Sequence, residues 1–415
     1  MSLQFITGNS GNGKTKYLFN RIVKEAKANP RDNYLVIVPE QFTMQTQRQL
    51  VDLSENKAIM NIDVLSFKRL AYRVFDELGI TNLTVLEETG KNLVLRKLAA
   101  QEADKLGVIG RNLNRIGYIS EVKSLLSELV QYNISPEELG RYIASGRLSD
   151  TLSDKLKDVL VLYEAFEKFM QDKYITAEEI LNVLSNVAEE SAILRNSVIA
   201  FDEFTGFTPI QNQLIKKLFV ISKKIYVTLT IDCREDIFKS RGMQELFDMP
   251  KRTVKSLTEM AAFYGIEVEE PIILDKNYRL AENEELSFME QQLFRKRRCS
   301  FKKAPKHIHI DCLRDPKQEL TKIARRINEL VRNENLRYRD IAIVTGDVNI
   351  YAGYVREIFD KYNIPYFIDA TQEILFHPFI EFIRSIPDIA AQNFSADAVF
   401  RFLRCGFSEL LDSEI

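Results

Sequence analysis

Short, mostly apolar runs alternate with amphipathic stretches in the N-terminal part of the chain. The runs at residues 3–7, 34–38 and 62–65 predict buried strands, because they have strand length and little polar alternation. Between the first two runs, the apolar residues from Leu18 to Ala26 recur at helical spacing and predict a helix. Strands that alternate with helices favour an α/β fold with a parallel sheet.

The pattern changes between residues 84 and 194, where only helical periodicity remains. We interpret this stretch as a helical domain inserted into the α/β domain, with its apolar stripes as packing core and not as a cofactor site. The stripes are Leu93, Leu95, Leu98 and Ala99; Val122, Leu125, Leu126 and Leu129; and Leu156, Val159, Leu160, Tyr163, Phe166 and Phe169. Cap-forming residues precede several predicted helices, namely Ser66, Ser135, Thr176 and Thr208.

The α/β pattern then returns, with predicted strands at residues 198–201, 225–230 and 271–274. After a basic stretch, a second α/β pattern begins. Its predicted strands are residues 307–313, 341–344 and 365–368. This pattern stops before the repeat is complete, so we expect an unfinished second unit in a chain that is part of a longer protein.

The predicted domain order follows from these changes. Residues 1–83 and 195–294 form the two parts of the first α/β domain, residues 84–194 the insertion, and residues 307–415 the incomplete second domain. Residues 295–306 join the two domains and carry Arg295, Lys296, Arg297, Arg298, Phe301, Lys302, Lys303 and Lys306. A solvated basic linker is the simpler interpretation. Contact with nucleic-acid phosphates, with Phe301 stacking on a base, is the alternative.

Composition narrows the class of protein. A chain of 415 residues with 45% hydrophobic and 28% charged residues is typical of a soluble protein with more than one domain. No apolar run reaches the about 18 residues of a membrane span, and the start lacks a secretory leader. Four scattered cysteines indicate neither a zinc site nor a disulfide framework and suit the cytoplasm. Because the net charge is −2, any DNA contact must come from local patches.

Residues 8–15 spell G-x-x-x-x-G-K-T between the first predicted strand and the first predicted helix. This is the order of a phosphate-binding loop, in which backbone N–H groups and the helix N-terminus face phosphate oxygens. Lys14 is expected to reach the β- and γ-phosphates of ATP, and the Thr15 hydroxyl to ligate Mg²⁺. The predicted nucleotide ligands are Gly8, Asn9, Ser10, Gly11, Asn12, Gly13, Lys14 and Thr15. The flanking elements disfavour a chance glycine-rich turn.

Two acids and an arginine are candidates for the rest of an ATPase site. Asp202 and Glu203 follow an apolar strand, where Asp202 can hold Mg²⁺ and Glu203 can polarise water. Two solvated acids before a helix are the alternative. Arg279 follows the last strand of the first α/β domain and can stabilise charge on a γ-phosphate, although an ordinary surface arginine explains the spacing equally well.

The order of these motifs resembles that of superfamily 1 helicases, which have two RecA-like domains. Three runs resemble more closely the AddB (RexB) family, one subunit of the AddAB helicase–nuclease. The runs are Val38-Pro39-Glu40-Gln41-Phe42-Thr43, Phe201-Asp202-Glu203-Phe204-Thr205-Gly206-Phe207-Thr208-Pro209 and Ile364-Pro365-Tyr366-Phe367-Ile368-Asp369. The resemblance runs over the whole chain.

The resemblance implies a heterodimer with an AddA-type helicase–nuclease subunit that resects double-strand DNA ends for homologous recombination. It implies contact with single-stranded DNA and duplex ends, and a C-terminal nuclease domain with an iron–sulfur cluster that this chain does not reach. None of the four cysteines here is therefore assigned to the cluster. Family members often carry glycine after the aspartate that corresponds to Asp202, whereas this chain has Glu203. That difference leaves room for ATP hydrolysis.

Other functions remain open at this point. The chain is a helicase-like ATPase part, an autonomous ATP-driven DNA translocase, or a non-hydrolysing module that binds ATP and DNA to scan sequence and hold AddA. An unrelated P-loop kinase is disfavoured by the long helical insertion and the second α/β unit.

Overall fold

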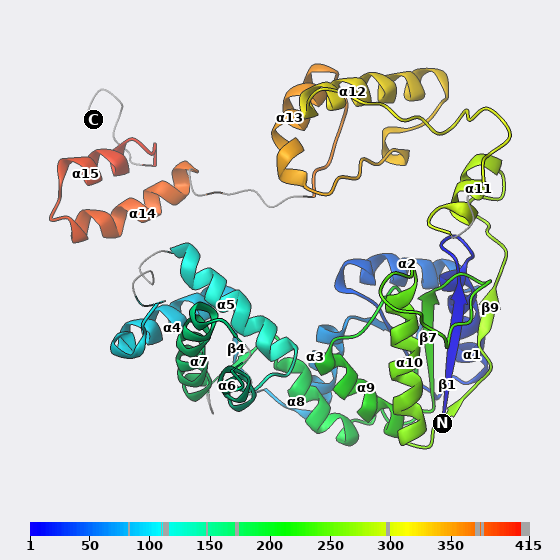
Figure 1. Cartoon of the computed structure of the whole chain (residues 1–415), viewed down its shortest axis with the longest axis horizontal. Helices are drawn as coiled ribbons and strands as arrows, with labels where there is room; N and C mark the ends of the chain where they lie inside the picture. The colour runs from blue at the N-terminus through cyan, green and yellow to red at the C-terminus, as the bar shows by residue number, and fades with distance from the viewer. Residues whose placement is uncertain are drawn as a thin grey trace. The chain divides into compact units, whose positions relative to one another are not determined.

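The computed structural model describes residues 1–81, 84–108, 110, 116–146, 148–170, 174–295, 299–369, 374 and 377–407. The chain divides into two compact units, Met1–His307 and Ile308–Ile415 (Figure 1). No helix in the described ranges is long and apolar enough to cross a membrane.

A seven-stranded parallel sheet organises the first unit. Its order is β3-β2-β6-β7-β1-β8, and β9 also pairs with β1. The strands are β1 (Ser2–Gly8), β2 (Tyr34–Ile37), β3 (Ile62–Leu65), β6 (Val198–Phe201), β7 (Lys224–Thr230), β8 (Glu267–Val268) and β9 (Ile272–Leu274). Every strand predicted from the sequence of this unit is present, and the α/β class is confirmed.

Helices cover both faces of this sheet, which is why its strands are apolar on both sides. Successive residues of β2 face opposite cores: Leu35 and Ile37 pack in one, and Val36 packs in the other. The second core is closed by α1 (Lys14–Ala28) and α2 (Thr43–Leu53). The first is closed by α3 (Phe67–Leu78), α8 (Ile180–Val187), α9 (Pro209–Ile221) and α10 (Asp248–Phe263).

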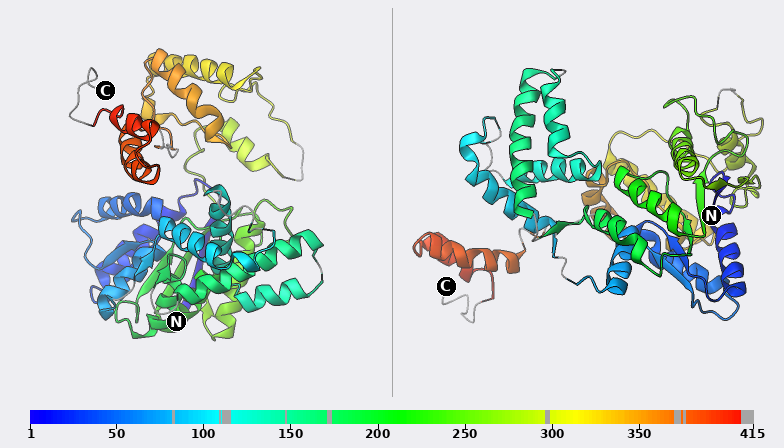
Figure 2. Two further views of the ribbon diagram at one scale, coloured as in Figure 1. Left: turned by 90° about the vertical axis from the view of Figure 1, so that its left-hand side faces the viewer. Right: turned by 90° about the horizontal axis from the view of Figure 1, so that it is seen from below.

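Part of the predicted insertion, residues 88–170, forms a helical group with a core of its own. It contains α4 (Glu88–Gln101), α5 (Ile116–Gln131), α6 (Pro136–Ala144) and α7 (Asp150–Met170), which gather as one group in Figure 2. The predicted stripes lie in this core except for two residues: Leu93 is 64% exposed, and the half-buried Leu156 does not pack in it. The structure also has a short parallel pair that the periodicity did not predict, β4 (Val85–Leu86) and β5 (Ile175–Thr176).

Three of the four predicted cap residues begin helices; Thr176 does not, because it ends β5 and α8 begins at Ile180 with Glu179 as its N-cap. The Ser66 and Ser135 hydroxyls accept hydrogen bonds from the backbone N–H groups of Arg69 and Glu138, both at 3.3 Å. Thr208 and Gln211 form a reciprocal capping box at the start of α9. This box fixes where α9 begins, directly after the turn that carries Asp202 and Glu203.

The second unit corrects three strand predictions. Among its described residues the structure has helices but no sheet, so residues 307–313, 341–344 and 365–368 are not paired strands. A strand needs a neighbour to hydrogen-bond with, and apolar periodicity alone does not supply one. The helices are α12 (Pro316–Asn333), α13 (Val348–Lys361), α14 (Pro378–Ala391) and α15 (Ala396–Leu403). One apolar side chain in each of the three segments is consequently exposed to solvent: Ile310 is 94%, Val344 93% and Phe367 89% exposed.

Candidate nucleotide-binding site

The loop between β1 and α1 has the backbone geometry that its glycines allow. Gly13 caps α1 in the left-handed conformation, with φ of +78°, and Gly11 has φ of +90°. A Cβ atom at Gly11 would lie 2.7 Å from Asn277 Oδ1 and 2.8 Å from Arg279 Cβ. Glycine is therefore required at this position by close approach as well as by conformation.

Residues 277–279 cross this loop and hold it from outside. The Tyr278 N–H donates to Gly11 O at 3.0 Å, and Asn277 Nδ2 donates to Ser10 O at 3.0 Å. Arg279 Nη1 donates to Ser10 Oγ at 3.3 Å. Because these bonds use loop oxygens, they leave the loop N–H groups available to phosphates. Sequence spacing left the role of Arg279 undecided, and the structure brings it to the loop.

Lys14 is the first residue of α1, and its side chain reaches back to the start of the loop. Its Nζ atom donates to Gly8 O and Asn9 O, each at 3.0 Å. Burial lowers the pKa of this ammonium group, while the nearby Asp202 and Glu203 carboxylates act in the opposite direction. The ammonium is thus held by neutral carbonyl oxygens, from which an anionic phosphate can draw it away.

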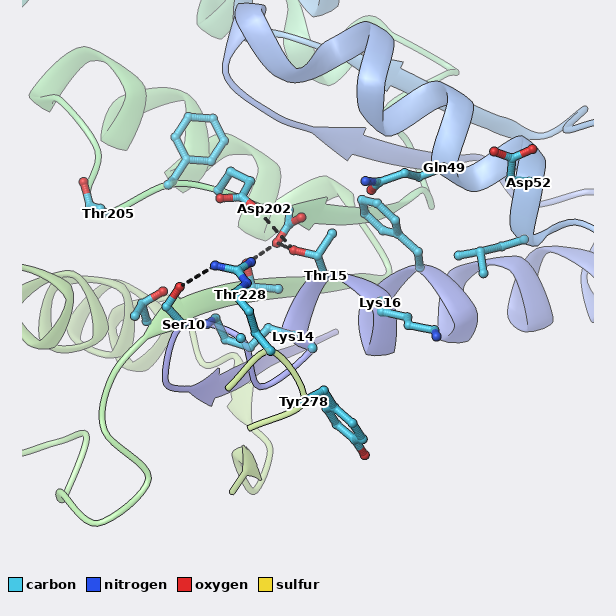
Figure 3. Close-up of a pocket in the computed structure, with 18 residues that line it drawn as sticks. Ser10, Lys14, Thr15, Lys16, Gln49, Asp52, Asp202, Thr205, Thr228 and Tyr278 are labelled. Carbon is cyan, nitrogen blue, oxygen red and sulfur yellow. Dashed lines mark hydrogen bonds between the residues drawn. The ribbon is translucent and has the colours of Figure 1, made fainter. Parts of the chain in front are cut away.

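Asp202 follows β6 and lies opposite the loop. Its side chain is 1% exposed, and its Oδ1 accepts hydrogen bonds from Thr15 Oγ1 at 3.3 Å and from Thr228 Oγ1. Figure 3 shows Thr15, Asp202 and Thr228 converging on this point. Burial is the main cause that raises the pKa of the Asp202 carboxyl.

The residues fit a magnesium ion. Asp202 Oδ2 is buried and has no hydrogen-bond partner within the described residues, which is costly for a carboxylate oxygen. Next to it stands the Thr15 hydroxyl. A carboxylate and a hydroxyl supply the hard oxygen ligands that Mg²⁺ takes beside nucleotide phosphates.

Glu203 lies next to the Thr15 hydroxyl on the solvent-exposed side of the site. Its Oε1 accepts a hydrogen bond from Thr15 Oγ1 at 3.3 Å, and the residue is exposed. Its backbone has φ of +64°, in the left-handed region. The turn that follows is fixed by aromatic packing, since Phe204 and Phe207 contact Phe201 with ring centroids 6.2 and 5.2 Å apart.

These side chains line one cavity of about 780 Å³. Of the predicted residues it includes Ser10, Gly11, Gly13, Lys14, Thr15, Asp202, Glu203 and Arg279. Residues that sequence reasoning did not assign to the site also line it, namely Lys16, Phe19, Gln49, Asp52, Leu53, Phe204, Thr205, Thr228, Thr230 and Tyr278. Two of these residues could have been predicted from the sequence. Tyr278 is next to Arg279, and Thr228 is a hydroxyl-bearing residue within an otherwise apolar strand.

Gly8, Asn9 and Asn12 do not line the cavity. The Asn9 side chain is 6% exposed, donates to Glu290 on α11 (Glu284–Gln292) and accepts from the Cys233 N–H at 3.2 Å. Asn12 is 2% exposed and donates to Leu274 O at 2.6 Å. These two side chains brace the loop from behind.

Two residues of the predicted basic linker pack against the first unit. Arg295 is not a solvated residue: its guanidinium pairs with the buried Asp232 carboxylate and lies 5.2 Å from the centroid of the Phe247 ring. Phe301 packs against Phe288, with ring centroids 5.3 Å apart. Lys296, Arg297 and Arg298 lie outside the described residues.

Comparison with known proteins places the chain in a family. Residues 5–290 match the family model described as "ADDB, N-terminal". The chain belongs to the AddB family. The resemblance found in the three motif runs is therefore confirmed.

Relatives named as the B subunit of an ATP-dependent helicase/deoxyribonuclease align with the whole of this AddB-family chain. It is 38% identical over 420 residues to that of Lachnoclostridium phytofermentans. The identity is 34% over 418 residues for Caldanaerobacter subterraneus and 33% over 424 residues for Clostridium tetani. The chain spans 36% of the length of each of these relatives.

Proposed function

We propose that this chain forms the ATP-binding, helicase-like part of a heterodimeric ATP-dependent helicase/deoxyribonuclease that resects double-strand breaks for recombinational repair. One observation carries the nucleotide part: Lys14 and Thr15 face Asp202 and Glu203 across one cavity. The names of the relatives support the wider role.

Each side chain has a task in this proposal. The loop N–H groups and Lys14 bind the β- and γ-phosphates, while Thr15 and Asp202 hold Mg²⁺, which neutralises phosphate charge. Arg279 lines the same cavity and can turn from Ser10 Oγ to the γ-phosphate. The exposed Tyr278 ring lies beside Gly13 and offers a face on which the base can stack.

Glu203 can orient an attacking water molecule beside the γ-phosphate. Its carboxylate is exposed to the cavity, and it is separated from Asp202 Oδ1 by the Thr15 hydroxyl that both contact. The two acids therefore have different environments: Asp202 is buried for the ion, and Glu203 is open to water. This division suits ATP hydrolysis.

The test of nucleotide binding is the substitution Lys14→Ala. Because it removes a point charge that faces the phosphates, ATP affinity should fall tenfold or more, about 1.4 kcal/mol, in calorimetry. Lys24→Ala, on an exposed face of α1, is the matched control and should bind ATP normally. Equal affinity of the wild type and Lys14→Ala would contradict the proposal.

A non-hydrolysing module that binds ATP and DNA is the second candidate, and an autonomous translocase the third. The second unit favours weak turnover by this chain alone, because it has no sheet among its described residues to carry an arginine toward a nucleotide. Such an arginine is worth roughly 10³ or more in rate. Turnover stimulated by single-stranded DNA above about 1 s⁻¹ would instead favour the autonomous translocase.

DNA and an AddA-type subunit are the proposed partners. Single-stranded DNA should bind through local basic patches, so log K should fall with log salt at about 0.7 per contacted phosphate. If the purified chain has no measurable affinity for single-stranded or duplex DNA, binding is supplied by the AddA-type subunit or by the rest of the longer AddB polypeptide.

A further inference from the structure

Thr228 is a buried hydroxyl-bearing residue at the edge of an apolar core. It lies on β7, the strand between β6 and β1, and is 3% exposed. Its register partner on β1 is Ile6, and Tyr226 lies two residues before it on the same face; both pack in the core closed by α1 and α2. Valine has nearly the same shape and would pack there without a polar atom to satisfy. Packing alone therefore does not explain the hydroxyl.

Strand register brings Thr228 beside Asp202. Phe201 pairs with Val227 in the parallel ladder of β6 and β7, so Asp202 and Thr228 come next on their two strands. The Thr228 hydroxyl donates to Asp202 Oδ1, and Figure 3 shows both side chains with Thr15. Because threonine is branched at Cβ, its hydroxyl has few orientations within a strand. The sheet itself thus fixes this donor.

Few other contacts set the orientation of the Asp202 carboxylate. Its backbone is fixed, since its N–H donates to Ile37 O at 3.1 Å, but the last torsion of an aspartate side chain is soft. Thr15 Oγ1 contacts the same Oδ1 at 3.3 Å, and in the proposed function that hydroxyl gives its oxygen to Mg²⁺. Asp202 Oδ2 has no partner among the described residues. Thr228 is accordingly the side chain that still holds the carboxylate once Thr15 binds the ion.

We propose that Thr228 is a positioning residue for the magnesium–nucleotide complex: its hydroxyl holds the Asp202 carboxylate in the orientation that binds Mg²⁺ beside ATP. This inference rests on the proposed function, in which Asp202 and Thr15 hold the ion. Thr228 acts through Asp202 and is not itself a ligand. A ligand that is already oriented loses less freedom on binding, and loss of such a supporting hydrogen bond typically lowers metal affinity about 10–100-fold.

ATP affinity with and without Mg²⁺ separates this role from a merely structural one. ATP is titrated into the full-length AddB polypeptide by calorimetry, once with excess Mg²⁺ and once with EDTA, and the readout is the ratio of the two Kd values. Wild-type protein should bind ATP more tightly with Mg²⁺. Thr228→Val keeps the shape of the side chain and should reduce this advantage about tenfold, or abolish a smaller one. Its Kd in EDTA should stay unchanged.

Three further variants control the comparison. Thr228→Ser keeps the hydroxyl and should keep the wild-type ratio. Ser197 is 0% exposed at the other end of β6 and donates to Leu194 O at 2.8 Å, so Ser197→Ala removes a buried hydroxyl away from the site and should leave the ratio unchanged. In an Asp202→Asn background, Thr228→Val should have no further effect on the ratio, because Thr228 acts through Asp202.

The outcomes distinguish this proposal from the proposed function. Equal ratios in the wild type and Thr228→Val would overturn the positioning role, as would a loss that Thr228→Ser does not restore or that Ser197→Ala reproduces. If Thr228→Val does not fold, Thr228→Ala serves in the same comparison. A wild type that does not bind ATP, or binds it equally with and without Mg²⁺, would contradict the proposed function and the positioning role with it.

Discussion

Glu203 holds a backbone conformation that glycine adopts more easily. Its φ of +64° costs a residue with a Cβ about 1–2 kcal/mol. Its side chain nevertheless stays in the cavity, where it contacts the Thr15 hydroxyl. Strain that is kept at a site is a reason to expect that the strained side chain is used there.

Glu203→Gly should therefore separate stability from turnover. Glycine relieves the left-handed backbone strain but has greater conformational entropy in the unfolded chain. The net effect should raise the free energy of unfolding by about 0.5–1 kcal/mol. ATP affinity should stay close to that of the wild type, while ATPase activity of the assembled heterodimer should fall. Thermal melts measure the stability, calorimetry the ATP affinity, and a turnover assay the ATPase activity. Glu203→Gln keeps the strain and removes the charge, so it should lose turnover without gaining stability; full activity in either variant would exclude Glu203 from the chemistry.

The buried Asp202 carboxyl should make the effect of Mg²⁺ depend on pH. Because burial raises its pKa in the folded protein, the stability it contributes is present below the usual carboxyl range and is lost as pH rises through the raised pKa. Mg²⁺ binds the ionised form and should recover that loss. The increase in Tm on adding Mg²⁺ should accordingly be larger at pH 8 than at pH 5. Asp202→Asn should abolish the difference; a pH-independent increase in the wild type would contradict this assignment.

At the scale of elements, α11 and the residues after it are fastened to the sheet by side chains. Glu290 on α11 accepts from Asn9 of the phosphate-binding loop, and Arg295 pairs with Asp232 beyond β7. Glu285 accepts from the backbone N–H groups of Lys306 and His307. α11 is thus joined to the phosphate-binding loop through Glu290, and Arg295, Lys306 and His307 are each held by an acid of the first unit.

Arg295→Gln should act on stability and not on DNA. Asp232 is 1% exposed and would keep only Arg234, whose side chain is 50% exposed. Leaving a buried carboxylate short of a partner costs about 1–3 kcal/mol, so Tm should fall. The salt dependence of DNA binding should not change. Lys302→Gln, at an exposed position nearby, is the control and should leave Tm unchanged. A lower salt slope with unaltered Tm would return Arg295 to a phosphate-binding role.

At the scale of the whole molecule, the two units differ in how far their cores are closed. The second unit keeps a small core of α12 and α13 residues, beside a cavity of about 780 Å³ lined by residues 341–345 and 364–369. Val344 and Phe367 are almost fully exposed next to it. Apolar segments of strand length need a neighbouring strand to be stable as a sheet.

Hydrogen exchange should reveal that neighbour. Amides of residues 309–313, 341–344 and 366–368 should exchange rapidly in the 415-residue chain, because no sheet protects them. In a polypeptide extended to the length of the relatives they should become protected, whereas β1 should be protected in both. Rapid exchange in the extended polypeptide would show that these segments are not strands in any context.

The sequence by itself determined the local features of this protein. Strands with both faces apolar, helix caps such as Thr208, and the glycine pattern of residues 8–15 each depend on neighbours a few residues away, so they were predictable. Asp202 was predicted because it directly follows an apolar strand, which is where the carboxylate that accompanies a phosphate-binding loop usually lies. The AddB motif runs likewise lie within single elements and turns.

Only the tertiary structure decided what depends on distant pairs. Residues 277–279 reach the phosphate-binding loop because β9 pairs with β1, which places Tyr278 and Arg279 in the cavity. Arg295 finds its acid more than sixty residues away along the chain. The three segments of the second unit have the apolar pattern of strands but do not form a sheet among the described residues. Strand pairing needs a second segment to hydrogen-bond with, and the pattern of one segment does not show whether that partner is present. The turn between β6 and α9, in which Glu203 has its left-handed φ, packs on Phe67 of α3, which lies far earlier in the chain.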